Sequence, residues 1–184
     1  VVNYTKDTYG SGSQNWSIIQ TDNSWMYFGN NYGLLQNDGI HWTTFPVTNH
    51  TCVRSLLYHD KTIYAGAEND FGYYKAEITG HLTFVSLASQ LAEHKRTFGN
   101  IWKIHEMGKD LYFQAEKSIF KYSDNKIVEI NVGEKIEHST IVSNTLWIVT
   151  TKNIYYLAGG LPISMEYPAL KDKKIVSILP FEGH

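Results

Sequence analysis

The chain has 184 residues, of which 42% are hydrophobic, 14% aromatic and 18% charged, a composition that excludes general disorder and supports a folded core. The 16 basic and 18 acidic residues give a formal net charge of −2, and no basic stripe stands out, so we expect no direct contact with nucleic acid. The single cysteine, Cys52, excludes an intrachain disulfide.

Residues 16–29 predict a β-hairpin with strands at 16–21 and 25–29. The turn at 22–24 is Asp-Asn-Ser, whose side chains bond nearby backbone groups, and its flanks are aromatic and β-branched, as strands favour. The pattern returns at 52–66 and 101–114, and more weakly at 138–149. The aromatic residues that begin each second strand are Tyr27, Tyr64, Tyr112 and Trp147.

Repeats of roughly 40 residues with four strands each are typical of propeller blades. We therefore expect an all-β fold, a β-propeller of about four blades with four antiparallel strands each. The whole of 1–184 forms a single propeller segment in this interpretation, a partial propeller from a larger ring. The expected blades are 16–46, 51–88, 98–131 and 138–168, and 174–184 would start a further blade.

The remaining elements follow in chain order. Residues 1–15 are polar and form a lead-in loop or, at 1–4, a strand of another blade. The Asn-Asp-Gly at 37–39 predicts a tight turn, and Ala, Leu, Gln and Glu at 89–95 favour one or two helical turns. The expected third and fourth strands of the blades are 33–35 and 40–45, 71–74 and 82–87, 118–122 and 126–130, and 154–157 and 163–167.

The chain does not begin with Met, has no basic segment followed by an apolar one, and contains no run of eighteen apolar residues. We interpret it as a piece of a longer protein or a mature product. Because a partial ring leaves strand edges and apolar faces uncovered at its ends, we also expect oligomerisation, as in a homodimer, or disorder there.

The segment Ile-Tyr-Ala-Gly-Ala-Glu-Asn-Asp-Phe-Gly-Tyr-Tyr at 63–74 carries a more specific resemblance, together with 26–35 and 37–42. The chain resembles the two-component-regulator propeller repeat, as found in the sensor region of Bacteroidetes regulators that carry a triple-tyrosine domain after the propeller. Starch-utilisation-type regulators and hybrid histidine kinases share this layout. The third and fourth repeats depart from it, because Gln114 and Val149 stand where the first two have Gly29 and Gly66.

The resemblance implies a periplasmic sensor whose parent protein is anchored in the inner membrane and ends in a kinase or a DNA-binding domain. It implies an oligosaccharide ligand, and partners in the remaining blades and the triple-tyrosine domain. Composition and periodicity do not establish these properties.

No catalytic constellation emerges from the sequence. The eight histidines include no pair at metal-ligand spacing, and neither a nucleophile elbow nor a phosphate-binding loop is present, so we expect no metal and no cofactor. Glu68 and Asp70 would face one side of an extended chain. They leave open a propeller glycoside hydrolase or lyase, although a loop acid that caps backbone N–H groups is the commoner role.

The candidate ligand-binding positions follow the second strand in the first three blades, where loops meet on one face, and include Trp102 at the entry of the third blade. Sugars are bound by planar amides, carboxylates and aromatic faces, and these positions offer that mixture. The simpler interpretation is that the Asn and Asp residues make turns and that Trp16, Trp42 and Trp102 pack between blades. The candidate residues are Asn30, Asn31, Tyr32, Glu68, Asn69, Asp70, Phe71, Trp102 and Glu116.

Three hypotheses follow from these patterns. The first is a non-catalytic, ligand-sensing propeller segment. The second is a propeller enzyme that uses Glu68 or Asp70. The third is a scaffold for protein interaction.

Overall fold

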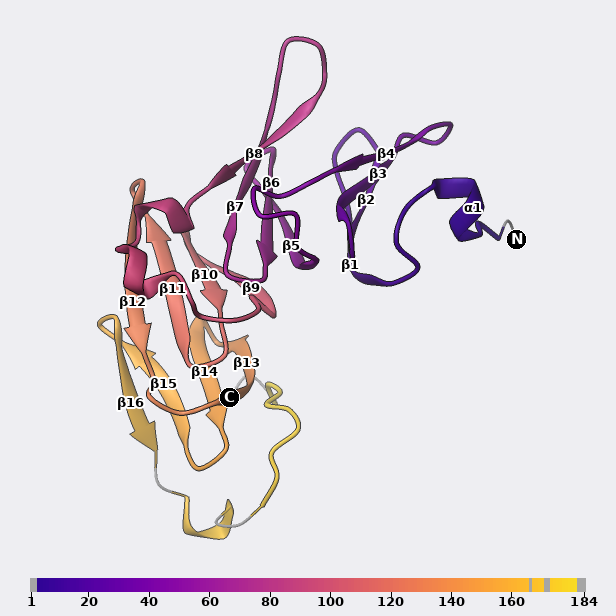
Figure 1. The fold of residues 1–184 in the computed structure, drawn as a ribbon. Coiled ribbons are helices and arrows are strands. Elements are labelled where there is room, and N and C mark those ends of the chain that lie inside the picture. The colour runs from indigo at the N-terminus through magenta and orange to yellow at the C-terminus, as the bar shows by residue number, and fades with distance from the viewer. Residues whose placement is uncertain (1–2, 166, 171–172, 182–184) are drawn as a thin grey trace. The chain divides into compact units, whose positions relative to one another are not determined.

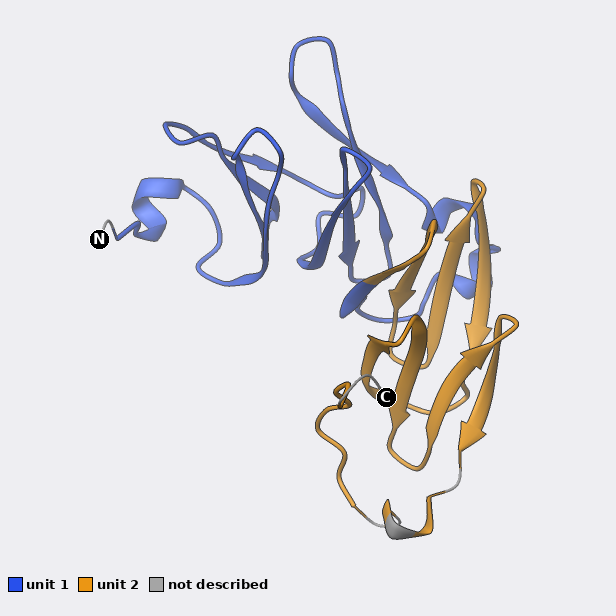
Figure 2. Ribbon diagram, turned by 180° about the vertical axis from the view of Figure 1, so that it is seen from behind, with its two compact units in different colours: residues 1–104 blue, residues 105–184 orange. Residues whose placement is uncertain are grey.

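In the computed structural model, which describes residues 3–165, 167–170 and 173–181, the chain is all-β, as the sequence predicts (Figure 1). Its strands form four sheets of four consecutive strands, and each sheet is a propeller blade. The chain divides into two compact units, residues 1–104 and 105–184 (Figure 2).

The first unit holds the first two blades. Its elements are α1 (Lys6–Tyr9), β1 (Asn15–Gln20), β2 (Met26–Asn30), β3 (Gly33–Asn37), β4 (Trp42–Phe45), β5 (Val53–His59), β6 (Thr62–Ala67), β7 (Phe71–Ala76), β8 (Leu82–Ser86) and the 3₁₀ turns η1 (Ala88–Gln90) and η2 (Glu93–Lys95).

The second unit holds the other two blades, and β9 (Lys103–Met107) crosses the boundary at its start. The remaining elements are β10 (Asp110–Gln114), β11 (Ser118–Ser123), β12 (Lys126–Asn131), β13 (Ile136–Val142), β14 (Thr145–Thr150), β15 (Ile154–Ala158), β16 (Leu161–Met165) and the 3₁₀ turn η3 (Pro168–Leu170).

The expected helical turns at 89–95 are present as η1 and η2.

The single-turn helix α1 was not expected. It packs on the outer strand of the first blade, where the ring centroids of Tyr9 and Trp42 lie 5.6 Å apart. The outer strand begins at Trp42 rather than at residue 40, since the N–H groups of Ile40 and His41 donate to Asp38 Oδ1 and so belong to the turn. The described residues 173–181 contain no strand, and 182–184 lie outside the described residues, so the further blade stays a prediction.

Tight hairpin turns set the register of the blades. Four of them close with two residues in left-handed backbone, which matches the right-handed twist of the strands, and Asp, Asn, Ser, Lys and Gly occupy these positions. The turns are 60–61, 124–125, 143–144 and 159–160.

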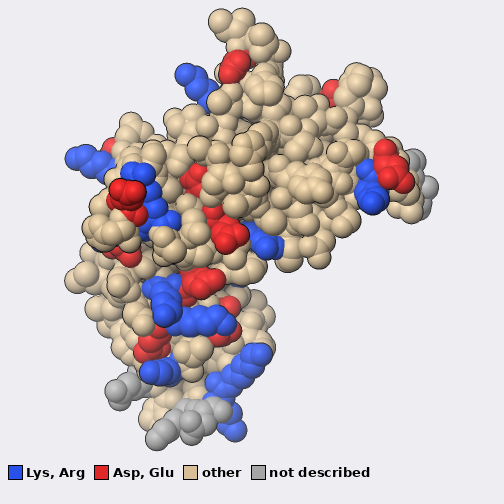
Figure 3. All heavy atoms as spheres, viewed as in Figure 1, with Lys and Arg blue, Asp and Glu red and all other residues tan. Residues whose placement is uncertain are grey.

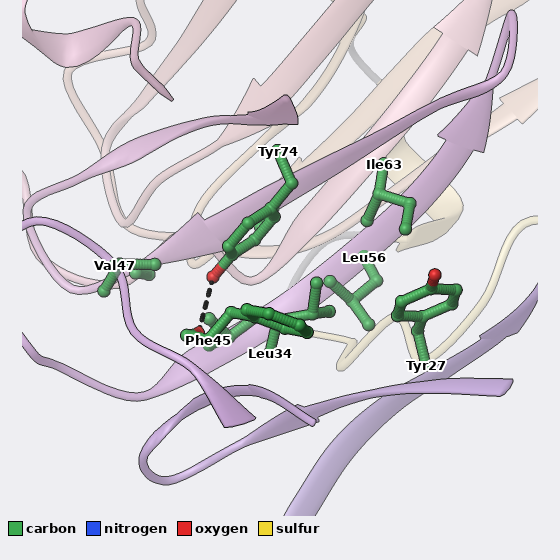
Figure 4. Close-up of a cluster of buried hydrophobic side chains, with 10 residues drawn as sticks. Tyr27, Leu34, Phe45, Val47, Leu56, Ile63 and Tyr74 are labelled. Carbon is green, nitrogen blue, oxygen red and sulfur yellow. Dashed lines mark hydrogen bonds between the residues drawn. The ribbon is translucent and has the colours of Figure 1, made fainter. Parts of the chain in front are cut away.

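Hydrophobic side chains of the first two blades form a common core (Figure 4). Tyr27 and Leu34 of the first blade pack with Leu56 and Ile63 of the second, and all four side chains are buried. The Tyr74 hydroxyl donates a hydrogen bond to the carbonyl oxygen of Phe45, at 3.1 Å, and so ties the second blade to the first. In the second unit a similar core joins β10, β11 and β12 to β13, β14 and β15.

Glycines of the repeat allow each blade to approach the next. Gly29 lies opposite Ser17 in the first blade, and Gly66 lies opposite Ser55 in the second. A Cβ atom on Gly29 would lie 2.9 Å from the carbonyl oxygen of Val53, and one on Gly66 would lie 2.3 Å from Cγ2 of Ile101. The two glycines therefore make room for the segment that starts the following blade.

This close approach predicts that a methyl group added at Gly66 destabilises the protein more than one added at Gly29. We expect Gly66→Ala to lower the free energy of unfolding by about 1–3 kcal/mol, because the methyl group overlaps the buried side chain of Ile101. Gly29→Ala is the matched comparison and should be milder, since its nearest contact is longer. Urea unfolding of both variants checks this order, and equal stability of Gly66→Ala and the wild type would contradict it.

A carboxylate in the second unit holds the last blade to the loop before it. Glu134 accepts hydrogen bonds from the Thr150 hydroxyl and from Asn153 Nδ2, the latter at 2.9 Å. The hydrogen bond from Thr150, followed by those from Asn153 and Tyr155, lowers the pKa of Glu134 below its usual value of 4.5.

Since the folded state holds Glu134 in its charged form, this carboxylate stabilises the fold above about pH 4.5 and ceases to do so as the pH falls through the lowered pKa. We expect Glu134→Gln to reduce stability at about pH 7 and to differ little from the wild type at about pH 3. Chemical unfolding at both pH values measures the gap between the two proteins. A gap that stays constant with pH would show that the charge of Glu134 is irrelevant.

Candidate functional site

The candidate site lies in the first unit, where the first strand of each blade begins. β1 has a bulge between Asn15 and Ser17, and β5 has one between Val53 and Ser55. A bulge re-aims the extra side chain, which here is Trp16 in the first blade and Arg54 in the second. Trp102, directly before β9, holds the same place in the third repeat.

The three side chains form a stack. The Arg54 guanidinium carbon lies over the Trp16 ring, 3.8 Å from its centroid, and 5.5 Å from the centroid of the Trp102 ring. A guanidinium on the face of an indole is attracted by the ring quadrupole, by about 0.5–1 kcal/mol at exposed sites and more where water is excluded. Each tryptophan is still 43% exposed, so the stack presents aromatic surface to solvent.

Amides orient the members of the stack. Trp16 Nε1 donates to Asn31 Oδ1 at 2.8 Å, and Arg54 Nε donates to Asn100 Oδ1 at 3.2 Å. Nη1 of Arg54 is buried and has no hydrogen-bond acceptor among the described residues. The site thus combines two aromatic faces, two amides and one guanidinium whose donors are only partly used.

Two of the residues predicted from the first two blades belong to this neighbourhood. Asn31 holds Trp16, and Glu68 forms an isolated backbone bridge with Asn100, while its own side chain is exposed. Trp102 was also predicted and is part of the stack. These three are the predicted residues that the structure brings together around Arg54.

Asn30 has a different role. It is completely buried, and its Oδ1 accepts hydrogen bonds from Ser11 Oγ and the Gly12 N–H, while its Nδ2 donates to the Gly12 carbonyl and to Asn15 Oδ1. A side chain with every polar group engaged and no exposed atom offers nothing to a ligand. Asn30 instead fixes the segment that leads into Trp16.

The loop after β6 is also largely structural. Asn69, in left-handed backbone with φ of 54°, accepts hydrogen bonds from the N–H groups of Phe98 and Gly99. Asp70 is 5% exposed and accepts from Ser86 Oγ, and Phe71 is fully buried against Phe98.

Glu68 and Asp70 do not form the paired carboxylates that the sequence suggested. The left-handed residue between them breaks the extended chain on which a shared face depends, so Glu68 is exposed whereas Asp70 is buried. Burial raises the pKa of Asp70, and the hydrogen bond from Ser86 opposes this effect. The pair therefore cannot hold a sugar between two accessible carboxylates.

The remaining predicted residues stand apart from the stack. Tyr32 is 64% exposed at the turn between β2 and β3. Glu116 belongs to the second unit, where its carbonyl oxygen accepts a hydrogen bond from the Ile136 N–H and its side chain is exposed.

Sequence reasoning missed Arg54 and Asn100, and assigned Trp16 to packing. Part of the signal was present in the repeat, because Arg54 and Trp102 each stand 12 residues before the repeat position at Gly66 and Gln114, and Trp16 stands 13 residues before Gly29, across a longer hairpin turn. The alignment does not reveal that Arg54 lies against both tryptophans.

No other arrangement among the described residues offers clear chemistry. No group of His, Cys, Asp and Glu there could hold a metal ion, and no helix in that part of the chain is long and apolar enough to cross a membrane. His105 Nε2 lies 2.7 Å from Ser139 Oγ, but Ser139 is fully buried and also bonds Gln114, so it is not an accessible nucleophile. On the face in Figure 3, acidic and basic side chains are interspersed.

No known protein family and no curated protein matches the sequence. Solved structures do resemble the fold. An extracellular domain named as part of a hybrid two-component system of B. thetaiotaomicron has a TM-score of 0.62 at 15% identity over 87% of this chain and 22% of its own length. A second such domain from the same organism has a TM-score of 0.60 at 14% identity, over 90% and 29%.

A third similar structure is a catalytically inactive virginiamycin B lyase from Staphylococcus aureus with quinupristin, with a TM-score of 0.63 at 19% identity over 91% of this chain and 59% of that one. The chain thus spans less than two thirds of each of these proteins, and less than a third of the two extracellular domains. At such low identity the similarity establishes the propeller fold and not the activity.

The contrast between Asn30 and Asn31 leads to a prediction. We expect Asn30→Ala to lower the free energy of unfolding by about 2–4 kcal/mol, because it leaves buried donors and acceptors of Ser11 and Gly12 unpaired. Asn31→Ala, which removes the partner of Trp16 at a half-buried site, should cost about 1 kcal/mol or less. Thermal and urea unfolding measure both, and similar stability losses would refute the scaffold role of Asn30.

Proposed function

We propose that the chain is a non-catalytic, ligand-sensing propeller segment of a membrane-bound regulator, located in the periplasm and responsive to an oligosaccharide. The observation that carries this proposal is the pair of half-exposed indoles, Trp16 and Trp102, which can bind a ligand without any catalytic group, together with the amides of Asn31 and Asn100, which accept hydrogen bonds from Trp16 and Arg54. Indole faces pack on the C–H faces of sugars, and amides bond sugar hydroxyls. The resemblance of the repeat to regulator propellers supports the same role.

The placement of the stack suggests how binding would be transmitted. Trp16 starts the first blade, Arg54 the second and Trp102 the third, so a ligand on the stack contacts three successive repeats. A ligand that prefers one packing of these repeats shifts the population of that packing. The remaining blades, a triple-tyrosine domain and a second copy of the chain are the proposed recipients of this shift.

An enzymatic role is the alternative, and the similarity to a lyase is what favours it. Within the described residues, however, Glu68 is the only accessible member of the proposed acid pair, and Asp70 is buried. A scaffold role remains the third hypothesis. Loss of glycoside cleavage in Glu68→Gln would identify the enzyme, and partner capture that ignores all sugars would identify the scaffold.

The sensing proposal predicts stabilisation by sugars. We expect at least one oligosaccharide from a panel of plant, host and microbial glycans to raise the melting temperature of the purified protein and to change its tryptophan fluorescence. Trp16→Ala and Trp102→Ala should each weaken binding at least about tenfold, because each removes one aromatic platform.

Trp147→Phe is the control, since Trp147 lies in the second unit against Tyr156, at 5.7 Å between centroids. It should leave the sugar response intact. The proposal is wrong if no glycan in the panel changes the melting temperature or the fluorescence of the wild-type protein. It is also wrong if Trp147→Phe weakens sugar binding as much as Trp16→Ala and Trp102→Ala do.

A further inference from the structure

The guanidinium of Arg54 has an edge with no hydrogen-bond acceptor among the described residues, and Nη1 on that edge is buried. The N–H groups of a guanidinium all point in its plane, and the Arg54 guanidinium carbon lies 3.8 Å from the centroid of the Trp16 ring and 5.5 Å from that of the Trp102 ring. Nε is engaged by Asn100 Oδ1, whereas Nη1 has no acceptor among the described residues. The part of the guanidinium left without a partner is the edge formed by its two terminal nitrogens.

The other arginine of the chain, Arg96, has hydrogen-bond acceptors for two of its guanidinium nitrogens. Arg96 donates from Nε to the Leu91 carbonyl at 2.9 Å and from Nη2 to the Ser89 carbonyl at 2.8 Å, and so fastens the loop that contains η1 and η2. Arg54 has one acceptor and no ion pair with any described carboxylate. A half-buried cation with a shielded, unpaired N–H is unfavourable unless an acceptor reaches it.

The geometry favours an anionic acceptor from outside the chain. A planar guanidinium edge matches the two oxygens of a carboxylate or sulfate, and such charge-assisted pairs are stronger than neutral hydrogen bonds. The half-exposed indoles beside Arg54 give the rest of the ligand an apolar support. A ligand that uses both features is a sugar with an acidic substituent.

We infer that Arg54 is an anion-recognition residue, whose unpaired terminal nitrogens bind the carboxylate or sulfate of an acidic oligosaccharide while the sugar ring lies on the exposed parts of the neighbouring indoles. This inference rests on the proposed sugar-sensing role and specifies its ligand class. The contact is non-covalent, and no proton or group is transferred.

Matched probes test the charge requirement. Trigalacturonate and its fully methyl-esterified form differ in charge and little in shape, and a 6-sulfated N-acetylglucosamine disaccharide has a desulfated counterpart. Titration calorimetry with the wild-type protein should give each anionic probe that binds an affinity at least about tenfold above that of its neutral partner, with the preference falling as salt is added. Which pair shows the preference distinguishes carboxylate from sulfate.

Variants assign the effect to Arg54. Arg54→Gln should abolish the preference for the anionic probe, and Arg54→Lys should keep only part of it, because an ammonium attracts the anion without the bidentate edge. Lys61→Asn removes the same charge from an exposed turn of the same blade, where φ of 57° suits Asn, and should keep the whole preference. Melting temperatures of all variants separate loss of folding from loss of recognition.

The outcomes separate this inference from the proposed function. Equal binding of charged and neutral sugars, or a preference that survives Arg54→Gln, overturns the role of Arg54 and leaves sugar sensing intact. Absence of binding by every anionic probe also overturns it. If inorganic sulfate binds at Arg54 as tightly as the sulfated sugar, Arg54 recognises anions as inferred and the sugar-sensing proposal fails.

Discussion

The close approach of each blade to the start of the next is the constraint on which the first unit depends. Without a side chain at Gly66, Ile101 can pack within the second blade, Ser55 Oγ can donate to the Ile101 carbonyl, and the Ile101 N–H can reach the Ala67 carbonyl. Similarly, Gly29 admits Val53. Because Arg54 and Trp102 directly follow Val53 and Ile101, these buried contacts fix where the side chains of the proposed site emerge. The position of the site is thus a consequence of packing between blades.

In the second unit, different side chains make the contact between one blade and the next. Gln114 and Val149 stand where the first unit has glycine, and Gln114 meets Ser139 of the following blade in a buried hydrogen bond, with His105 on the other side of that serine. At this point the second unit thus joins its blades by a hydrogen bond between two side chains, whereas in the first unit a serine side chain bonds the backbone of the next blade opposite a glycine. A side chain at the repeat position demands a partner on the next blade, which explains why the strict glycine pattern fades along the sequence without loss of the fold.

Much of the fold could be predicted from the sequence because hairpin turns and alternating side chains are local signals. The turn at 124–125 and the strands beside it follow from neighbouring residues alone. Helix α1 could not be predicted, since four residues carry too little propensity and it is held by tertiary contacts to Trp42. The same distinction applies to the site. Asn31 and Trp102 were found by composition, whereas the stacking of Arg54 on two tryptophans joins residues distant in sequence.

The bulges explain how one repeat can carry both structure and recognition. Trp16 and Arg54 lie at bulges, where the regular pairing of the strands is interrupted. Their side chains therefore do not follow the strand's alternation of inward and outward side chains, which places neighbouring residues in the core. Glu137 occupies the corresponding bulge of the fourth blade and is exposed. Tryptophan, arginine and glutamate are thus all tolerated at one structural position. If the bulge residues bind a ligand as proposed, a propeller built in this way can change its ligand by exchanging them, while the buried contacts of the adjacent residues hold the blades in place.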